Sequence, residues 1–259
     1  CSSTTDSVLD NVHASGKCNV ESVPLPRRGV PAADTRILRS EIITLEMRPG
    51  GREIQTMRTD APGQLEFRPN RPGEPHRTMD AERIRINYGE DNAIDTFQAA
   101  NVKTRTDKPA PPPKNGKAQP SSPPAFTVSQ GLLAKFAPGT NQTATLMQEG
   151  NFRYDEGPRH AIAEKAVLEQ KNNRITLTQK AKVWDDTGTT SADVIVLNQQ
   201  SGDMDALGHV ATSRQPDQSK NGQSAGMLNE SQPLQARAEK MLTRDDNFKI
   251  HYEGHSVLW

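Results

Sequence analysis

The sequence is poor in apolar and aromatic residues. Only 32% of its 259 residues are hydrophobic and 4% are aromatic, whereas a globular domain usually holds about 45–50% apolar residues with glycine counted. This composition argues against one large sealed core. No run approaches the roughly 20 apolar residues of a membrane-spanning helix. The 32 Lys and Arg balance the 32 Asp and Glu, so no excess charge indicates a nucleic-acid partner.

Cysteine is also scarce. Cys1 and Cys18 allow at most one internal disulfide, and a zinc or iron–sulfur framework needs more ligands than that. We therefore expect no metal and no cofactor. The Cys-Ser-Ser start is typical of a mature bacterial lipoprotein with a lipidated first residue. The alternative is that the sequence simply begins at this cysteine and that Cys1 carries no lipid. We favour this alternative because no signal segment is present.

What the chain does contain is alternation of apolar and polar residues at period two, the pattern of half-buried strands. Ala161–Gln170 has a helical composition but no helical apolar stripe. We predict an all-β chain of antiparallel strands, with turns at Gly and Asp clusters between them. The clearest strands are expected over Ile84–Tyr88, Arg174–Gln179, Val194–Leu197, Met204–Val210 and Phe248–Tyr252.

The strands recur as degenerate repeats. From Ala163 to Ala192 the offset is 192 − 163 = 29 residues, within the range of stacked repeat architectures. Leu9–Gly16 resembles the tail of such a copy, and Trp259 follows shortly after a new strand pair has begun. We expect the natural protein to continue on one or both sides.

Two low-complexity stretches divide the sequence. Residues 107–125 contain seven prolines and predict an extended linker or loop, while residues 213–232 are rich in Gln, Ser, Asn and Gly and predict a polar loop. The predicted organisation is then an extension or preceding-repeat tail at 1–35, a first β segment at 36–106, the linker at 107–125, and a second β segment at 126–259.

Three motifs stand out along the predicted strands. They are Ala192-Asp193-x-Ile195-x-Leu197, Gly202-Asp203-Met204-x-Ala206-x-Gly208-x-Val210, and Gly150-Asn151-Phe152-x-Tyr154 before an Ala-rich strand. These motifs resemble the OstA-like family of lipopolysaccharide-transport proteins, which includes LptA, LptC and the N-terminal domain of LptD. The resemblance covers residues 36–106 and 126–259, with a loose match over Arg36–Asn70 and long insertions at the two low-complexity stretches.

The resemblance implies a β-jellyroll, a folded-over pair of antiparallel sheets (a β-taco) that forms a slide for lipid. It implies a non-enzymatic periplasmic protein that binds and transports lipopolysaccharide, with the acyl chains of lipid A inside. The expected partners are lipopolysaccharide and other transport jellyrolls, which would join by edge-strand stacking. Self-association would use the strands near Val8–Ser15 and Phe248–Val257. Membrane anchoring would come from segments outside this chain or from a lipidated Cys1.

The strand pattern alone fits two interiors, an ordinary sandwich core or a groove left open for apolar chains. The pattern favours the sandwich, and the resemblance favours the groove. Arg83, Arg85 and Arg153 would meet the phosphates of the lipid at the rim, or else simply solvate the outer face. The predicted lipid-groove residues are Ile84, Ile86, Phe152, Tyr154, Ile175, Leu177, Ile195, Leu197, Met204, Phe248 and Ile250.

Other constellations carry less. His251-x-Glu253-x-His255 has metal-ligand spacing on a strand, but a solvated strand end bent at Gly254 explains it better. Asp185-Asp186 precedes Thr-Gly and predicts a turn.

The competing function is a structural β-solenoid or adhesin-like repeat protein without a lipid ligand. A β-helix carbohydrate-active enzyme would need convergent carboxylates that the sequence does not offer.

Overall fold

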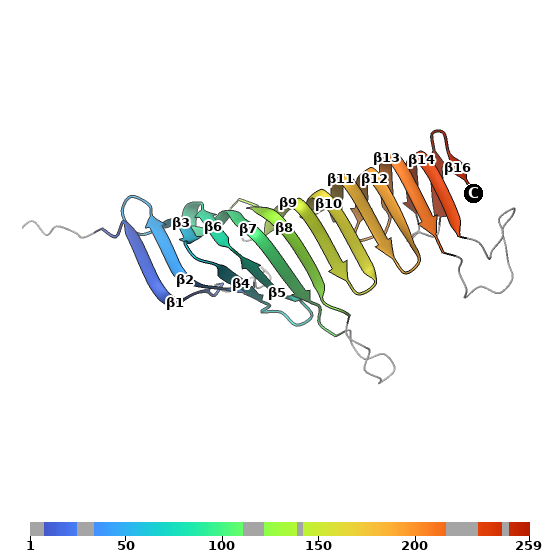
Figure 1. The fold of residues 1–259 in the computed structure, drawn as a ribbon. Helices are drawn as coiled ribbons and strands as arrows, with labels where there is room; N and C mark the ends of the chain where they lie inside the picture. Colours follow the sequence, from blue (N-terminus) through green and yellow to red (C-terminus); the bar gives the residue numbers. More distant parts are fainter. Residues whose placement is uncertain (1–7, 25–33, 111–121, 139–141, 216–232, 245–248) are drawn as a thin grey trace, which may run out of the picture. The chain divides into compact units, whose positions relative to one another are not determined.

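The computed structural model describes residues 8–24, 34–110, 122–138, 142–215, 233–244 and 249–259. Within them the chain forms antiparallel strands and two short 3-10 turns, with no α-helix (Figure 1). The predicted all-β fold is confirmed. None of the described helical turns is long and apolar enough to cross a membrane.

The chain divides into two compact units, Cys1–Leu146 and Met147–Trp259, and β9 runs across the boundary. The strands up to this boundary are β1 (Asn11–Ser22), β2 (Thr35–Met47), β3 (Ile54–Thr59), β4 (Gly63–Arg68), β5 (His76–Ala81), β6 (Arg83–Tyr88), β7 (Ile94–Asp107), β8 (Ala125–Phe136) and β9 (Thr143–Glu156), with the 3-10 turn η1 (Glu90–Asn92) before β7.

The strands that follow are β10 (Arg159–Glu169), β11 (Arg174–Asp185), β12 (Gly188–Asn198), β13 (Met204–Arg214), β14 (Leu234–Arg244), β15 (Lys249–Glu253) and β16 (Val257–Leu258), with the 3-10 turn η2 (Gln170–Asn172) before β11. The segment with helical composition is therefore strand β10. Four of the five expected strands are confirmed in full, and in the fifth Phe248 lies outside the described residues.

Most of the linker expected at 107–125 and of the loop expected at 213–232 also lies outside the described residues. The described flanks are β7, which ends at Asp107, β8, which begins at Ala125, and β13, which ends at Arg214. The division of the chain into segments that these stretches suggested stays a prediction.

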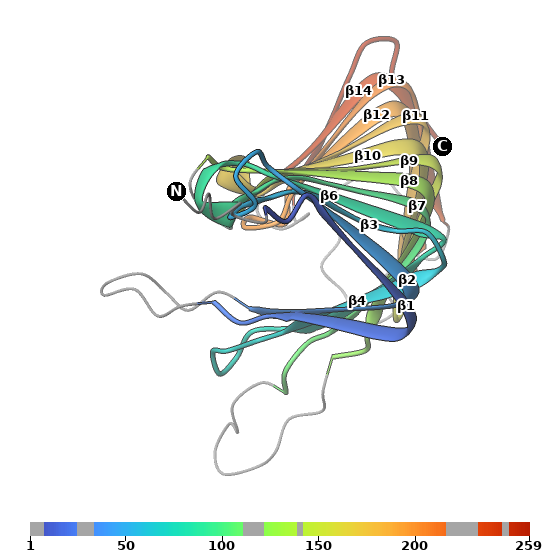
Figure 2. The ribbon, with the colours of Figure 1, turned by 90° about the vertical axis from the view of Figure 1, so that its left-hand side faces the viewer.

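In the first unit the strands fold over at a corner, so that two arms face each other (Figure 2). We call the arm built around β4 and β5 the first arm, and the arm built around β3 and β6 the second arm. Longer strands contribute to both. In β2, Leu38 pairs with β4, whereas Ile43 pairs with β3. In β7, Thr104 pairs with Met79 of β5, whereas Phe97 pairs with Ile86 of β6.

In the second unit each long strand runs through both arms. The first arm of this unit contains Arg159–Ala163, Ala181–Asp185, Gly188–Ala192, Val210–Arg214 and Leu234–Ala238. The second arm of this unit contains Lys165–Glu169, Arg174–Thr178, Val194–Asn198, Met204–Leu207, Lys240–Arg244 and β15. The pairing register shifts between the halves of β10, β11, β12 and β13. Such shifts are β-bulges, which bend and twist a strand.

The bends of the second unit lie at pairs of residues with positive φ. Gly150–Asn151, Gln179–Lys180 and Gly208–His209 follow one another at 29-residue intervals, the same interval that separates Ala163 from Ala192. Glycine is needed at Gly208, where φ is +74° and a Cβ would come within 2.3 Å of a carboxylate oxygen of Asp193. The repeat read from the sequence thus reflects a corner that recurs once per strand pair.

Polar side chains join neighbouring strands along the corners. In the first unit Asn101 Nδ2 donates to Glu82 at 2.7 Å. In the second unit the Nδ1 of His209 lies 2.8 Å from Asp193, and the Nδ1 of His255 lies 2.7 Å from Glu239. Each pair joins a residue in the left-handed region to an acid of the neighbouring strands or, for Glu82, of the link between β5 and β6.

Candidate functional site: the interior between the arms

The predicted lipid-groove residues lie in the two apolar interiors. Ile84 and Ile86 are 1% and 4% exposed in the cluster of the first unit. In the second unit Phe152, Leu177, Ile195 and Met204 are buried, and Tyr154, Ile175, Leu197 and Ile250 pack against them half-buried. Phe248 lies outside the described residues. The described side chains therefore belong to the apolar interiors, whereas their role as lipid-groove residues stays a prediction.

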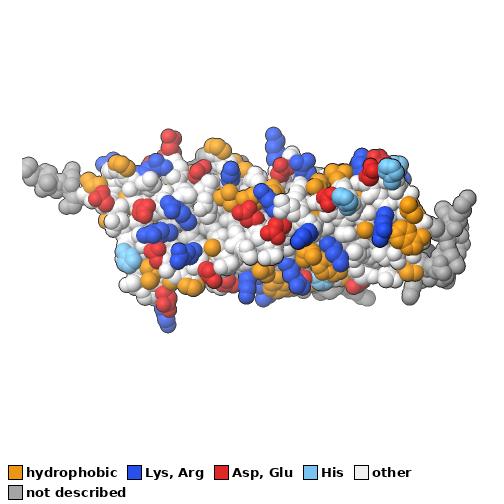
Figure 3. Space-filling model, turned by 45° about the horizontal axis from the view of Figure 1, so that its top comes forward, with side chains coloured by type: hydrophobic (Ala, Val, Ile, Leu, Met, Phe, Trp, Pro, Cys, Tyr) orange, Lys and Arg blue, Asp and Glu red, His pale blue; other side chains and the backbone are white. Residues whose placement is uncertain are grey.

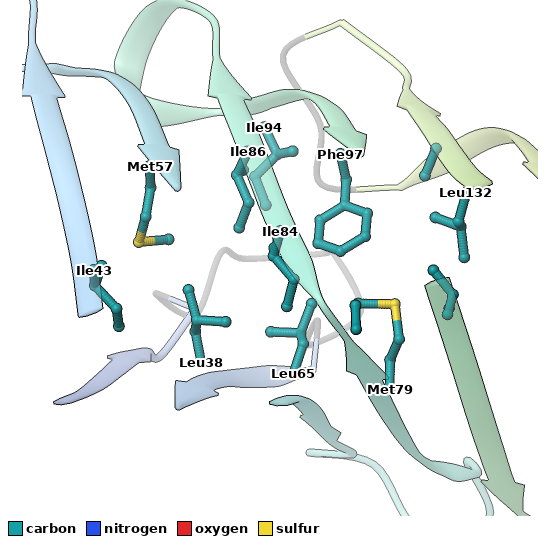
Figure 4. Close-up of a cluster of buried hydrophobic side chains, with 13 residues drawn as sticks. Leu38, Ile43, Met57, Leu65, Met79, Ile84, Ile86, Ile94, Phe97 and Leu132 are labelled. Carbon is teal, nitrogen blue, oxygen red and sulfur yellow. The ribbon is translucent and has the colours of Figure 1, made fainter. Parts of the chain in front are cut away.

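The interior of the first unit is filled with large side chains from both arms. Figure 4 shows Leu38 and Leu65 pointing from the first arm toward Met57, Ile86 and Phe97 of the second. Leu38 pairs with Leu65, and Met57 pairs with Ile86. Long side chains on both arms interdigitate and bury much apolar area, which stabilises the contact between the arms.

The interior of the second unit differs between its arms. In the first arm Ala181 pairs with Ala192, and Val210 pairs with Ala238; Ala161, Ala163 and Ala236 are buried there as well. The second arm supplies larger side chains, with Leu177 paired to Ile195. An alanine side chain buries far less apolar area than leucine or methionine, so less contact is lost when an arm lined by alanine moves away.

We call the part of each unit that lies far from the corners, where the two arms end, its mouth. Polar contacts bridge the arms there. In the first unit the guanidinium of Arg36 lies 5.6 Å from the ring centroid of Phe136, and burial lowers the pKa of Arg36. Within the second arm, Arg48 Nη2 donates to the carbonyl of Tyr88 at 2.7 Å, and burial raises the pKa of the Tyr88 hydroxyl to about 12. Charge is thus held beside an apolar interior.

In the second unit the mouth is closed differently. The hydroxyls of Thr212 and Tyr252 lie 2.9 Å apart and link the first arm to the second. Glu156 is 2% exposed and pairs with Arg159 at 3.0 Å, while the Tyr154 hydroxyl donates to it. Burial and the Glu156 carboxylate raise the pKa of Tyr154. This carboxylate is a charged group that the strand pattern did not predict.

The three predicted phosphate-rim arginines project from the outer face. Arg83 and Arg85 are exposed and alternate with the inward Ile84. Arg85 Nε donates to Asn87 at 3.2 Å, and Arg153 pairs with Asp155 at 2.7 Å. Their contact with phosphate stays a prediction. Sequence reasoning missed Arg36, although the alternation Arg36-x-Leu38 already places it on the inner face.

The histidines near the C-terminal strands do not converge. The corner at Gly254 turns His255 toward Glu239, whereas His251 lies 3.3 Å from Glu253. The described residues hold no group of three side chains able to bind a metal ion. The predicted turn at Asp185 is confirmed, because its carboxylate accepts hydrogen bonds from the backbone N–H groups of Thr187 and Gly188 at 2.8 and 3.0 Å.

The face shown in Figure 3 carries charged side chains of both signs, interspersed with one another. On the first unit Glu66 pairs with Arg39 at 2.8 Å and with His76 at 3.1 Å. The hydrogen bond with His76, and to a lesser extent the hydrogen bond with Arg39, lowers the pKa of Glu66 to about 2.

A pocket of about 760 Å³ lies beside the corner of the first unit. Its lining includes three basic and three acidic side chains: Lys17, Arg39, Lys103, Glu41, Asp80 and Glu82.

Comparison with known proteins identifies one family. Residues 75–203 match the family model described as LptA/(LptD N-terminal domain) LPS transport protein. The matched segment runs from just before β5 to just before β13, and it includes the motifs at Gly150–Tyr154 and Ala192–Leu197. The match confirms the resemblance to lipopolysaccharide-transport proteins. A search of curated proteins finds no match.

Proposed function

Residues 75–203 place this chain in the LptA/LptD N-terminal family of lipopolysaccharide-transport proteins, and from that premise we propose that it is a non-enzymatic carrier that holds the acyl chains of lipid A between the arms of its β-fold. One observation carries the proposal. In the second unit the first arm is lined mainly by alanine, and it faces a second arm in which leucine, isoleucine and methionine stand beside the smaller Ala166 and Ala206.

The energetics support an exchange of one apolar partner for another. To admit a guest, the arms must part and lose their mutual contacts, which are smallest where one side is alanine. Each methylene of a guest chain that enters is worth about 0.8 kcal/mol, so ten buried methylenes contribute roughly 8 kcal/mol. The sugars and phosphates remain at the mouth in water because their burial without partners is costly.

The proposed carrier works in the periplasm, the compartment that lipopolysaccharide crosses between two membranes. Transport of this kind breaks no covalent bond and needs only a surface on which the lipid moves. The acyl chains would contact Leu177, Ile195 and Leu197 on one side and alanines on the other. The first unit, whose large side chains meet across its interior, would hold lipid less readily.

The proposal is tested by filling the space beside the alanines. Ala163→Phe and Ala192→Phe place a ring where an acyl chain should lie, and overpacking costs about 1–3 kcal/mol of stability. We expect binding of fluorescently labelled lipopolysaccharide, competed by free lipid A, to fall at least tenfold while the circular dichroism spectrum is retained. Ile162→Phe is the matched control, because Ile162 neighbours Ala163 on β10 and is 37% exposed.

Three results would contradict the carrier. The unmodified chain does not bind lipopolysaccharide; the two alanine variants stay folded and bind it normally; or the control loses as much binding as they do. The first result would favour the structural repeat protein, whose strands present only an outer surface.

We also propose that the chain associates with other jellyrolls of the family, or with itself, through its terminal strands. β1 pairs with β2, and β15 and β16 both pair with β14, so within the described residues each has one backbone edge toward solvent. Such edges accept a further strand. Light scattering over a concentration series should show growing mass, and a constant monomer mass at millimolar concentration would contradict self-association.

A further inference from the structure

The outer face of the first arm in the second unit carries a strip of side chains that runs across the strands. Lys182 and Trp184 of β11 alternate with Ala181 and Val183, which belong to the apolar interior, so the first two point outward. Their partners on the neighbouring strands share this face. The row from Trp184 continues through Thr189, Ser213 and Gln235 to Trp259, and the row from Lys182 continues through Ser191 and Ala211 to Arg237. We call these two rows the outer strip.

Each end of the outer strip holds a cation above an aromatic ring. At one end the Nζ of Lys182 lies 5.4 Å from the ring centroid of Trp184. At the other end the guanidinium of Arg237 lies 5.7 Å from the ring centroid of Trp259, a residue that is 52% exposed. A cation and a ring attract each other at these distances. The rings therefore hold both cations at the surface without neutralising their charge.

The Trp184 end of the outer strip is held in place by its neighbours. The ring of His160 stacks on that of Trp184, with 5.1 Å between the centroids and 20° between the planes. The Nδ1 of His160 lies in turn 2.6 Å from Asp155. A group that is already ordered loses little conformational entropy when a ligand binds, which favours recognition at this end.

Between its two ends the outer strip is low and polar, with short hydroxyl side chains, one alanine and one glutamine. The hydroxyls of Thr189 and Ser213 and the amide of Gln235 make no hydrogen bond to another described residue. Trp184 and Trp259 lie four strand spacings apart, about 19 Å, which is longer than a single sugar ring. Such a surface offers hydrogen bonds but little apolar area, so it suits a chain of hydroxyl-bearing rings better than a membrane.

The two cations of the outer strip have no carboxylate partner among the described residues. The acids two positions further along the same strands as Ser191 and Arg237 are engaged elsewhere, Asp193 with His209 and Glu239 with His255. The carboxylate of Asp185 accepts hydrogen bonds from its own turn. Lys182 and Arg237 therefore favour an anionic ligand on this face.

We propose that the outer strip binds an acidic oligosaccharide laid across β11 to β14, with its anionic groups at Lys182 and Arg237 and its hydroxyls over the short polar side chains between them. Charge-assisted hydrogen bonds hold the anionic groups, and the C–H groups of a sugar ring pack against the exposed Trp259. The inference does not depend on the proposed carrier, because this face needs no acyl chain. Two sources supply such a chain, the saccharide of a glycolipid held between the arms and a separate glycan.

The test uses two probes that differ in charge, a hexamer of galacturonic acid and its neutral methyl ester. In titration calorimetry the unmodified chain should bind the acid at least tenfold more tightly than the ester, and salt should weaken binding of the acid alone. The double variant Lys182→Gln with Arg237→Gln should weaken binding of the acid about tenfold, the size expected for charge-assisted hydrogen bonds, and leave the ester unchanged. Lys171→Gln with Lys240→Gln removes the same charge elsewhere in this unit and is the matched control.

Trp259→Ala tests the contact that does not depend on charge. It should weaken binding of both probes by the same factor, about threefold, and the circular dichroism spectrum should be retained because the residue is exposed. If the double variant melts early, Arg237→Gln alone, at an exposed residue, decides by the same ratio of the two affinities.

Binding of neither probe by the unmodified chain, equal binding of both, or an equal loss in the matched control would overturn the inference. Anionic phosphatidylglycerol vesicles test a membrane contact instead. If they bind the unmodified chain, lose affinity in the double variant and are not displaced by the hexamer, the inference is overturned as well. None of these results bears on lipid binding between the arms.

The saccharide released from lipopolysaccharide by mild acid separates the two sources. Competition with the hexamer assigns the outer strip to the transported lipid, whereas hexamer binding without such competition assigns it to a separate glycan. Either result supports a saccharide site on this face.

Discussion

The two units fold the same kind of strand over a corner but fill the space between their arms differently. In the first unit leucine, methionine and phenylalanine extend from both arms, and Arg36 bridges the mouth. In the second unit mainly alanine faces larger residues, and the Thr212–Tyr252 pair closes the mouth. The comparison teaches that strand alternation decides which residues are inside, and that their size decides how firmly the arms are held together.

The corners differ as well. In the second unit continuous strands turn at regularly spaced left-handed pairs such as Gly208–His209. In the first unit the chain is interrupted instead, between β3 and β4 and between β5 and β6. Interrupted strands give up ladder hydrogen bonds, and side chains replace part of them: Thr59 Oγ1 accepts from the backbone N–H of Ile84 at 2.9 Å.

The largest expected effect separates the two interiors. Ile84→Asp and Ile195→Asp each place a carboxylate at a site 0–1% exposed. Ile84→Asp should cost more than about 4 kcal/mol and unfold the first unit, because its tightly filled interior cannot admit water. Ile195→Asp should cost less, since the alanine arm can move away, but should abolish lipopolysaccharide binding. Thermal unfolding followed by circular dichroism, with a binding assay, measures both.

The comparison of the two interiors depends on which of these two variants loses more stability. If Ile195→Asp unfolds the chain as completely as Ile84→Asp, the second interior is an ordinary sandwich core. Retained folding together with normal lipid binding would exclude Ile195 from the lipid site.

A second prediction concerns acid stability, which the Glu66 cluster gives to the first unit. The pKa of Glu66 is about 2 instead of 4.5. The stability that Glu66 contributes to the folded state is therefore complete above pH 4.5 and is lost as the pH falls toward 2. Glu66→Gln should lower the free energy of unfolding at pH 7 by less than the roughly 3 kcal/mol that the pKa shift alone would give, because solvent screens the half-exposed Arg39 and His76, and it should flatten the decline of that free energy between pH 4.5 and 2. Urea titrations across this range measure it. An unchanged acid slope would show that other carboxylates dominate.

The smallest effect is expected at the exposed corners. Asp193 raises the pKa of His209, so this contact stabilises the fold below the ordinary histidine pKa and is lost as the pH rises through the raised value. In Asp193→Asn the His209 pKa should return toward its ordinary value, measured by NMR titration, with little change in unfolding midpoint because both groups are exposed. Asp205→Asn, which affects Arg244 instead, is the control.

Local sequence determined much of this protein. Alternation over Ile84–Tyr88 and Met204–Val210 specified strands, because side chains on a strand point to opposite faces at period two. The Asp185–Gly188 turn followed from a side chain that binds its own backbone. The motifs around Phe152 and Ile195 were sufficient to indicate the family that the match over residues 75–203 identifies.

The tertiary structure decided what the strands enclose. The sequence could not pair Ala181 with Ala192 or set this alanine arm against Leu177 and Ile195, because those contacts depend on register and on the fold at the corner. It placed Arg36 on a strand face but could not bring Phe136, one hundred residues away along the chain, to its side. Long-range contacts depend on how the strands pair across the whole unit, and local alternation contains no information about that pairing.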